Sequence, residues 1–529
     1  MTHSAASTLS PEEIRRRLRE GEEIALLDLR EEGPFAAGHP LFAVNLPLGR
    51  IEERIAGLIP RRDAPIVLYD DGEGRVARAL PVLATLGYSQ VAVLEGGLAG
   101  WRQSGGEIFI DVNVPSKAFG ELVEHVRHTP SIPARALHDR IARGDDLVIL
   151  DARRFSEYNV MSIPGGRSVP GGELALRVRD IAPSADTTVV VNCAGRTRSI
   201  IGAQSLINAG IPNPVVALRN GTIGWTLEGL ALDRGATRRA GDVTRDNAAL
   251  ARQNAAALAE RTGVRVIGAD TLAALLADPA RTLYRLDVRT PEEYERGHLA
   301  GFRSAPGGQL VQATDEWIGV RHGTIVLTDD DGVRARMTGH WLRQLGWREV
   351  YVLDGWSDLP RESGPEPVLL AASPPEVEMI APSDLAALRD EAWVIDLATS
   401  PEFRRGHIPG ARFAIRTGLA DHPAMETVRE IVLTSPDGLA ARLAAPELAR
   451  QGRHVRVLGG GTRAWQQAGL GLETGLDPAT ALFGADDVYK RPYEGTDNAA
   501  AAMQAYLDWE FGLVAQLERD GTHGFTVLE

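Results

Sequence analysis

The stretch that decides the fold is VVVNCAGRTRSII at residues 189–201, which passes from a strand through a short loop into a helix. Its first three residues are valines, as expected of a strand buried on both faces of a parallel sheet. Residues 199–209 contain no proline, and Gly210 offers a stop for a helix. The only cysteine, Cys193, therefore lies at the carboxyl edge of a strand, where open α/β sheets bind ligands.

A second type of strand, which ends in an aspartate, occurs four times in the chain. Each copy precedes a strand–loop–helix stretch like the one at 189–201. The aspartate-ended strand reads LLDLR at 26–30, ILDAR at 149–153, RLDVR at 285–289 and VIDLA at 394–398. After each copy come a glycine turn, a further apolar strand, a helical stretch and a last strand leading to glycine and tryptophan. This order predicts an α/β protein of four tandem domains, each a mostly parallel sheet flanked by helices.

The landmarks also predict where each domain begins and ends. Residues 111–130 are interpreted as a linker, and 241–263, rich in alanine and leucine, as a connecting helix. A C-terminal extension, 475–529, is too aromatic for a disordered tail, so we expect it to pack on the domains. The domains, named 1 to 4 below, are predicted at 1–110, 131–235, 264–362 and 376–474.

Composition excludes several classes of partner. The net charge of −14 argues against nucleic acid and against an anionic membrane surface. No apolar run approaches the roughly 18 residues that suggest a membrane span, and residues 1–17 lack the apolar region of a secretory signal. A single cysteine forms no internal disulfide and no cysteine-based metal site, so we expect a cytoplasmic protein without a metal.

The loop around Cys193 has the features of a site for a reactive thiol. The thiolate is the reactive form, and both a helix N-terminus and the charges of Arg196 and Arg198 favour it. Ala194 and Gly195 are small enough for several amides to point at one sulfur. The simpler alternative is that a lone cysteine acts as a buried apolar residue. Because glycine, arginine and serine are poor core neighbours, we expect an exposed, ionised thiol instead.

These motifs resemble the rhodanese (thiosulfate sulfurtransferase) superfamily over nearly all of the chain up to about Gly475. The resemblance implies that Cys193 takes sulfane sulfur from thiosulfate or 3-mercaptopyruvate and passes it to cyanide or a thiol, without a cofactor. Asp151 and Arg153 match the first-strand pair of that family, to which we give a mainly structural role. The donor would be bound and the sulfur cradled by Ala194, Gly195, Arg196, Thr197, Arg198 and Ser199.

The other three domains depart from the family pattern at the cysteine position. Asp70, Asp329 and Ser435 stand opposite Cys193 in domains 1, 3 and 4. A carboxylate cannot carry sulfane sulfur and repels an anionic donor, and a serine lacks the sulfur chemistry. We therefore expect these domains to be inactive and architectural. Domain 2 itself lacks the Gly-His turn of the other copies, since it reads SIPG at 162–165.

Two other functions stay open on the sequence alone. Phosphatases that share the fold need an arginine six positions after the cysteine, but that position is Ser199 and the arginine comes one residue earlier. The shorter loop favours sulfur over phosphate. A non-catalytic scaffold or sensor is the second alternative, because three of the four domains lack a nucleophile. The basic cysteine loop argues against it for the whole chain.

Overall fold

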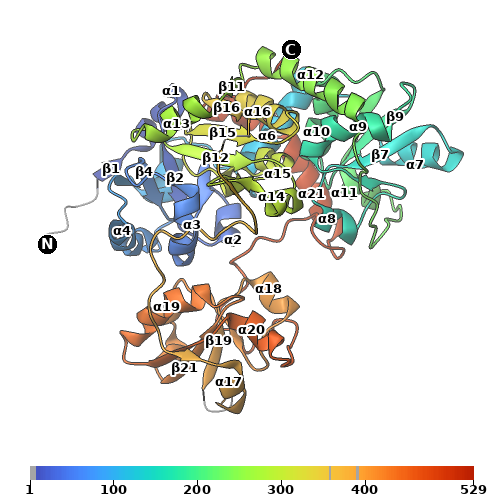
Figure 1. Ribbon diagram of the computed structural model, residues 1–529. Coiled ribbons are helices and arrows are strands. Elements are labelled where there is room, and N and C mark those ends of the chain that lie inside the picture. The colour runs from blue at the N-terminus through green and yellow to red at the C-terminus, as the bar shows by residue number, and fades with distance from the viewer. Residues whose placement is uncertain (1–6, 357–358, 389–391) are drawn as a thin grey trace.

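The computed structural model describes residues 7–356, 359–388 and 392–529, in which four five-stranded sheets follow one another along the chain (Figure 1). Neighbouring strands in these sheets pair in parallel. Counted within each sheet, the spatial order of the strands is 1-5-4-2-3 in all four. This repetition confirms the predicted fold class of four tandem α/β domains.

Each sheet runs from one edge to the other in the same sequence of strands. Domain 1 has β1 (Ser7–Leu9), β5 (Val91–Leu94), β4 (Ile66–Tyr69), β2 (Ala25–Asp28) and β3 (Ala43–Asn45). Domain 2 has β6 (Ser131–Ile132), β10 (Val215–Leu218), β9 (Thr188–Asn192), β7 (Leu147–Asp151) and β8 (Arg167–Ser168). Domain 3 has β11 (Arg265–Ile267), β16 (Val350–Leu353), β15 (Thr324–Thr328), β12 (Leu283–Asp287) and β14 (Arg303–Ser304), with a small antiparallel pair of β13 (His298–Leu299) and β17 (Arg361–Glu362). Domain 4 has β18 (Met379–Ile380), β22 (His454–Leu458), β21 (Glu430–Thr434), β19 (Trp393–Asp396) and β20 (Arg412–Phe413).

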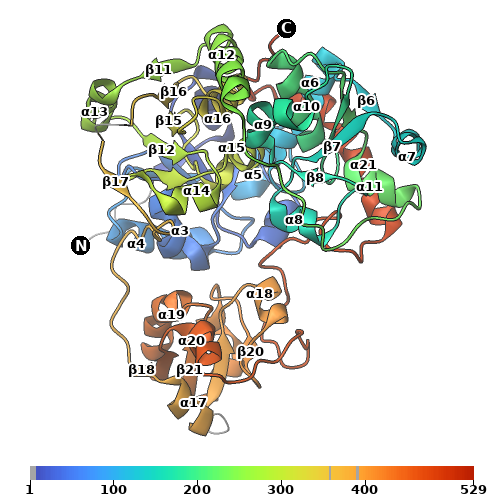
Figure 2. The ribbon, with the colours of Figure 1, turned by 45° about the vertical axis from the view of Figure 1, so that its right-hand side comes forward.

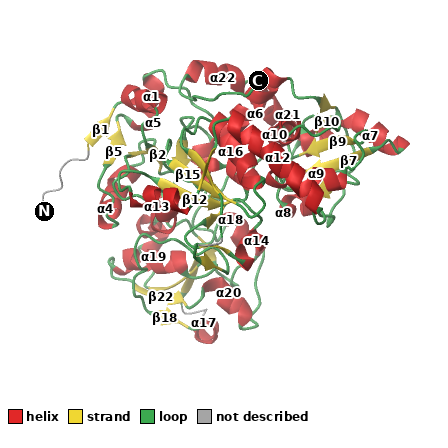
Figure 3. Cartoon of the chain, turned by 45° about the horizontal axis from the view of Figure 1, so that its top comes forward, coloured by secondary structure: helices red, strands yellow, loops and turns green. Residues whose placement is uncertain are grey.

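Helices lie around each of these sheets (Figure 3). Domain 1 has α1 (Pro11–Glu20), α2 (Glu32–Ala36), α3 (Ile51–Leu58), α4 (Arg75–Thr85) and α5 (Gly97–Gln103), and domain 2 has α7 (Ala134–Arg143), α8 (Phe155–Val160), α9 (Leu174–Ile181), α10 (Thr197–Asn208) and α11 (Gly221–Leu227). Domain 3 has α13 (Ala269–Ala277), α14 (Pro291–Arg296), α15 (Gly307–Gln312) and α16 (Arg334–Gln344), and domain 4 has α17 (Pro382–Leu388), α18 (Ser400–Arg405), α19 (Leu439–Ala449) and α20 (Gly461–Gln467). Among the described residues, no helix is both long and apolar enough to cross a membrane.

The helix that follows the cysteine loop sits very close to its sheet. All five residues of β9 are buried, as the valine run predicts. A Cβ added to Gly202 of α10 would lie 2.9 Å from both Leu174 Cδ1 and Val191 Cγ1. A glycine at this point therefore allows α10 to approach the sheet, and the approach fixes where the loop and Cys193 stand.

The predicted linker 111–130 is largely a helix, α6 (Val114–Arg127). The segment carries none of the repeated landmarks, and for that reason its sequence suggests only a linker. Its apolar side chains, among them Phe119 and Val123, belong to the core that domains 1 and 3 share. The Phe119 ring meets that of Trp341 edge-on at 5.7 Å. Between domains 2 and 3, the expected connecting helix is α12 (Arg245–Arg261).

The C-terminal extension returns from domain 4 to the other three domains (Figure 1). Its helices are α21 (Ala500–Phe511), which packs against α6 and α11, and α22 (Leu513–Asp520), which packs against α6. Domain 4 forms a separate lobe in Figures 1 and 2 and has apolar clusters of its own. Arg416 docks it on domain 1 through Glu52, with nitrogen–oxygen distances of 2.8 and 3.0 Å.

We predict that Arg416→Ala loosens this lobe. Arg416 is largely buried, so its loss leaves Glu52 and Glu447 without their shared partner. Limited proteolysis within residues 363–378 should become faster by roughly tenfold, while the reactivity of the Cys193 thiol is unchanged. Arg463→Ala, an exposed arginine in the same domain, is the control. Equal cleavage rates in both variants would contradict this role.

Candidate active site

The four cysteine-position residues occupy the same place in their domains. Cys193 comes directly after β9, and Asp70, Asp329 and Ser435 come directly after β4, β15 and β21. In each domain a helix begins four or five residues later. The correspondence proposed from the sequence is therefore a structural one, and each loop lies at the carboxyl edge of a parallel sheet.

Cys193 itself is buried, with only 2% of its surface exposed. Its Sγ lies 3.5 Å from Ser199 Oγ. Burial raises the pKa of the Cys193 thiol, and the charge of Arg198 opposes that rise without cancelling it. The expectation of an exposed, ionised thiol is thus wrong for this conformation, because a segment remote in sequence covers the loop.

That cover is the C-terminal extension. Tyr493, Met503, Tyr506 and Leu507 form one apolar cluster with Ala194 and with Ile223 of α11. A Cβ added to Gly195 would lie 3.2 Å from Tyr506 Cε1 and 3.4 Å from Glu510 Oε2. The extension therefore packs directly on the cysteine loop, and a side chain larger than glycine at position 195 would push it away.

A buried lysine anchors this cover to α6. Lys117 Nζ lies 2.7 Å from Asp111 Oδ1. Three rings of the extension surround the same ammonium, with centroids at 5.7 Å for Tyr493, 5.2 Å for Tyr506 and 5.6 Å for Trp509. Cation–π attraction is strongest where water is excluded, so these contacts hold α21 against α6.

Arg198 is the arginine whose charge opposes the rise in the pKa of the Cys193 thiol. Its two terminal nitrogens contact Glu157 of α8 at 2.8 and 2.9 Å. Burial alone would raise the pKa of Glu157, but the guanidinium outweighs it and holds that pKa at about 2. Glu157 therefore stays ionised and fixes Arg198, whose charge favours the thiolate of Cys193.

Arg196 is not aimed at the sulfur. Its Nε and Nη2 each lie 2.7 Å from an oxygen of Glu121 on α6, and Nη2 also contacts Glu124. The Phe511 ring covers the guanidinium, with its centroid 4.2 Å away. The expectation that Arg196 binds the donor is therefore not supported, because carboxylates of α6 neutralise its charge and no local pattern places them there.

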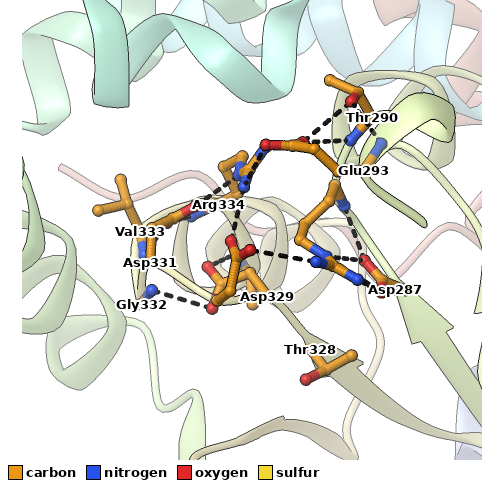
Figure 4. A network of polar contacts seen from close by, with 12 residues as sticks. Asp287, Thr290, Glu293, Thr328, Asp329, Asp331, Gly332, Val333 and Arg334 are labelled. Atoms are coloured by element: carbon orange, nitrogen blue, oxygen red, sulfur yellow. Dashed lines mark hydrogen bonds and ion pairs between the residues drawn. The ribbon is translucent and has the colours of Figure 1, made fainter. Parts of the chain in front are cut away.

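The loop amides have an anion-binding geometry that domains 1 and 3 reveal. In domain 3, Asp329 accepts from the amides of Gly332 and Ala335 at 3.0 and 2.9 Å (Figure 4). In domain 1, Asp70 accepts from those of Gly72 and Val76 at 3.0 and 3.1 Å. Each carboxylate is thus held by its own loop, at the place that the side chain of Cys193 occupies in domain 2.

Two further predicted residues, Asp151 and Arg153, form an ion pair close to the cysteine loop. Arg153 Nε and Nη2 lie 2.9 and 2.6 Å from the two oxygens of Asp151, and Nη2 also donates to the Met161 carbonyl. Asn192, next to the cysteine, donates to Asp151 at 3.0 Å. Through Asp151, the end of β7 is hydrogen-bonded to the end of β9. Thr197 contacts the cover instead, with Oγ1 3.4 Å from Glu510 Oε1.

A cavity of about 340 Å³ lies between α11 and the extension. Thr222 and Tyr493 are among its lining residues, and the Thr222 amide donates to the Cys193 carbonyl at 2.9 Å. Within the described part of the chain, no group of three or more histidine, cysteine or acidic side chains is arranged to hold a metal ion.

Comparison with known proteins agrees with this geometry. The family model of the rhodanese-like domain matches residues 10–104, 133–228, 268–357 and 381–468. The crystal structure of a thiosulfate sulfurtransferase from Pseudomonas aeruginosa is similar over 99% of this chain and 100% of that one, at 53% identity and a TM-score of 0.96. A thiosulfate sulfurtransferase from Azotobacter vinelandii is 25% identical over 248 residues, which cover 39% of this chain and 89% of that protein. The chain belongs to the rhodanese family, with four rhodanese-like domains in tandem.

Proposed function

We propose that this protein is a thiosulfate sulfurtransferase in which Cys193 carries the transferred sulfur as a persulfide. The observation that carries the proposal is the loop that binds a carboxylate in domains 1 and 3. A cysteine persulfide anion places its terminal sulfur about where an aspartate places a carboxylate oxygen, two bonds beyond Cβ. The same amides in domain 2, between Ala194 and Ser199, would stabilise that sulfur.

The reaction would run in two displacements. The Cys193 thiolate attacks the outer sulfur of thiosulfate, a new S–S bond forms, and the old one breaks with its electron pair leaving on sulfite. An acceptor, cyanide or a thiolate, then attacks the terminal sulfur and releases the Cys193 thiolate. 3-Mercaptopyruvate is the second candidate donor, but the positive charge of Arg198 beside the thiol favours the dianionic thiosulfate.

Because Cys193 is buried, the C-terminal extension must move away from the loop in each cycle so that substrates can reach the thiol. The contacts on Gly195 come from Tyr506 and Glu510, so a small displacement of α21 exposes the loop. We infer that substrates enter beside Tyr493, from the cavity between α11 and the extension. A free thiol that must stay reduced also suits the cytoplasm.

The alternatives fit less well. A phosphatase would need an arginine where Ser199 donates to the Arg196 carbonyl at 2.7 Å. A pure scaffold would have no use for a thiol at the position where domains 1 and 3 hold a carboxylate. The domains with Asp70, Asp329 and Ser435 do fit an architectural role.

We predict that thiosulfate forms a covalent intermediate on Cys193. Incubation with thiosulfate should add one sulfur atom to the intact protein, and cyanide should remove it as thiocyanate. Cys193→Ser should abolish both, because a hydroxyl is not ionised near neutral pH. Intact-mass spectrometry before and after cyanide is the measurement. Equal thiocyanate production by wild type and variant would favour the scaffold alternative.

The second prediction separates the two arginines. Arg198→Ala should raise the KM for thiosulfate by roughly tenfold and raise the Cys193 pKa, since the charge beside the thiol is lost. Arg196→Ala should change KM by less than about threefold but lower Tm, because Glu121 is left buried without a partner. Steady-state kinetics and thermal melts check this. A larger KM change for Arg196→Ala than for Arg198→Ala would reverse the assignment.

A further inference from the structure

A carboxyl from the C-terminal extension lies against the cysteine loop. Glu510 of α21 has no exposed surface. Its Oε1 accepts from Tyr506 Oη at 2.9 Å and from Thr197 Oγ1 at 3.4 Å. Its Oε2 faces Gly195 and has no hydrogen-bond partner among the described residues. An acidic side chain from outside all four domains is thus directed at the proposed sulfur cradle.

The positive charges near Glu510 are already engaged. On α6, Lys117 is paired with Asp111, and Arg196 of the loop is paired with Glu121. Tyr493 and Tyr506 are neutral phenols whose pKa values burial raises. From α11 the neighbouring side chain is the apolar Ile223. Within the part of the chain that the structure describes, Glu510 therefore has no counter-ion of its own.

We propose that Glu510 is a positioning residue that sets the charge of the Cys193 site, admitting anionic sulfur compounds only while its own carboxyl is uncharged. The proposal deepens the proposed function, on which it rests for the identity of the donor. It assigns to the extension a part in substrate selection, in addition to its part as a cover.

The direction of the pH effect follows from the surroundings. Burial raises the pKa of Glu510 to about 8, Glu121 adds to the rise, and Lys117 and Arg196 oppose it. Below that pH the carboxyl of Glu510 is neutral, and an anion meets the loop amides and the Arg198–Glu157 pair. Above it, a negative charge stands in a site of low dielectric, where it repels a second anion far more than in water.

Alkylation of Cys193 tests this without any turnover. Because it is the only cysteine, iodoacetate and iodoacetamide both report on this thiol alone. Thiolate formation and opening of the cover affect both reagents equally, so the ratio of their rates isolates the repulsion of an anion. Between about pH 6.5 and 9.5, the iodoacetate rate divided by the iodoacetamide rate should fall by roughly fivefold or more in wild type. Glu510→Gln should keep it constant within about twofold.

The matched control is Glu124→Gln, which removes a half-buried carboxylate that also contacts Arg196 but is not directed at Gly195. This control variant should show the same fall in the rate ratio as wild type. The same fall in Glu510→Gln would overturn the proposal, and so would a Cys193 that resists both reagents at every pH. If instead the ratios behave as expected while thiosulfate adds no sulfur, the proposed donor is wrong and the charge-setting role stands.

A thermal melt provides a second readout of the same ionisation. The folded-state pKa of Glu510 is raised, so wild type loses stability as pH rises from the unfolded value of about 4.5 to about 8. The Tm difference between Glu510→Gln and wild type should therefore become more positive over that range. A difference that does not change with pH would contradict a buried, titrating carboxyl.

Discussion

The structure depends on one constraint: the backbone amides at the carboxyl edge of a parallel strand need a hydrogen-bond acceptor in the side chain that follows the strand. Domains 1 and 3 meet it with their own carboxylates, Asp70 and Asp329. Domain 2 instead places there the thiol of Cys193, which under the proposed function would carry the transferred sulfur. A difference of one side chain, between aspartate and cysteine, thus separates a self-satisfied loop from a reactive one.

Around this turn the protein buries charges in matched pairs. Three such pairs surround the loop: Arg198 with Glu157, Arg196 with Glu121, and Lys117 with Asp111. Such pairs add little net stability but are costly to break, so they fix geometry. In the first pair, the charge of Arg198 opposes the rise that burial causes in the pKa of the Cys193 thiol. The second joins the loop to α6, and the third holds Lys117, whose ammonium three rings of the extension surround. Access to Cys193 therefore depends on how α21 moves.

The sequence was sufficient for the repeat, the strand–loop–helix order at the cysteine loop and the position of Cys193 directly after a buried strand, because all of these follow from local patterns. It was insufficient for α6, which carries no repeated motif, and for the orientation of Arg196, which depends on Glu121 some 75 residues away. Burial of Cys193 was missed for the same reason. The aromatic residues of the extension signalled packing, but nothing local showed that Tyr506 and Glu510 would meet Gly195.

The inactive domains acquire a physical role from these contacts. Domains 1 and 3 share one apolar core with α6 and α22, and α21 packs against both of these helices as well as against α11. Tyr284 of domain 3 donates to the Leu58 carbonyl of domain 1 at 2.6 Å within that core. A site on domain 2 alone would have neither Lys117 nor Glu510 beside it. Domains 1 and 3 are therefore the frame that places the extension, and with it the Glu510 carboxyl, against the cysteine loop of domain 2.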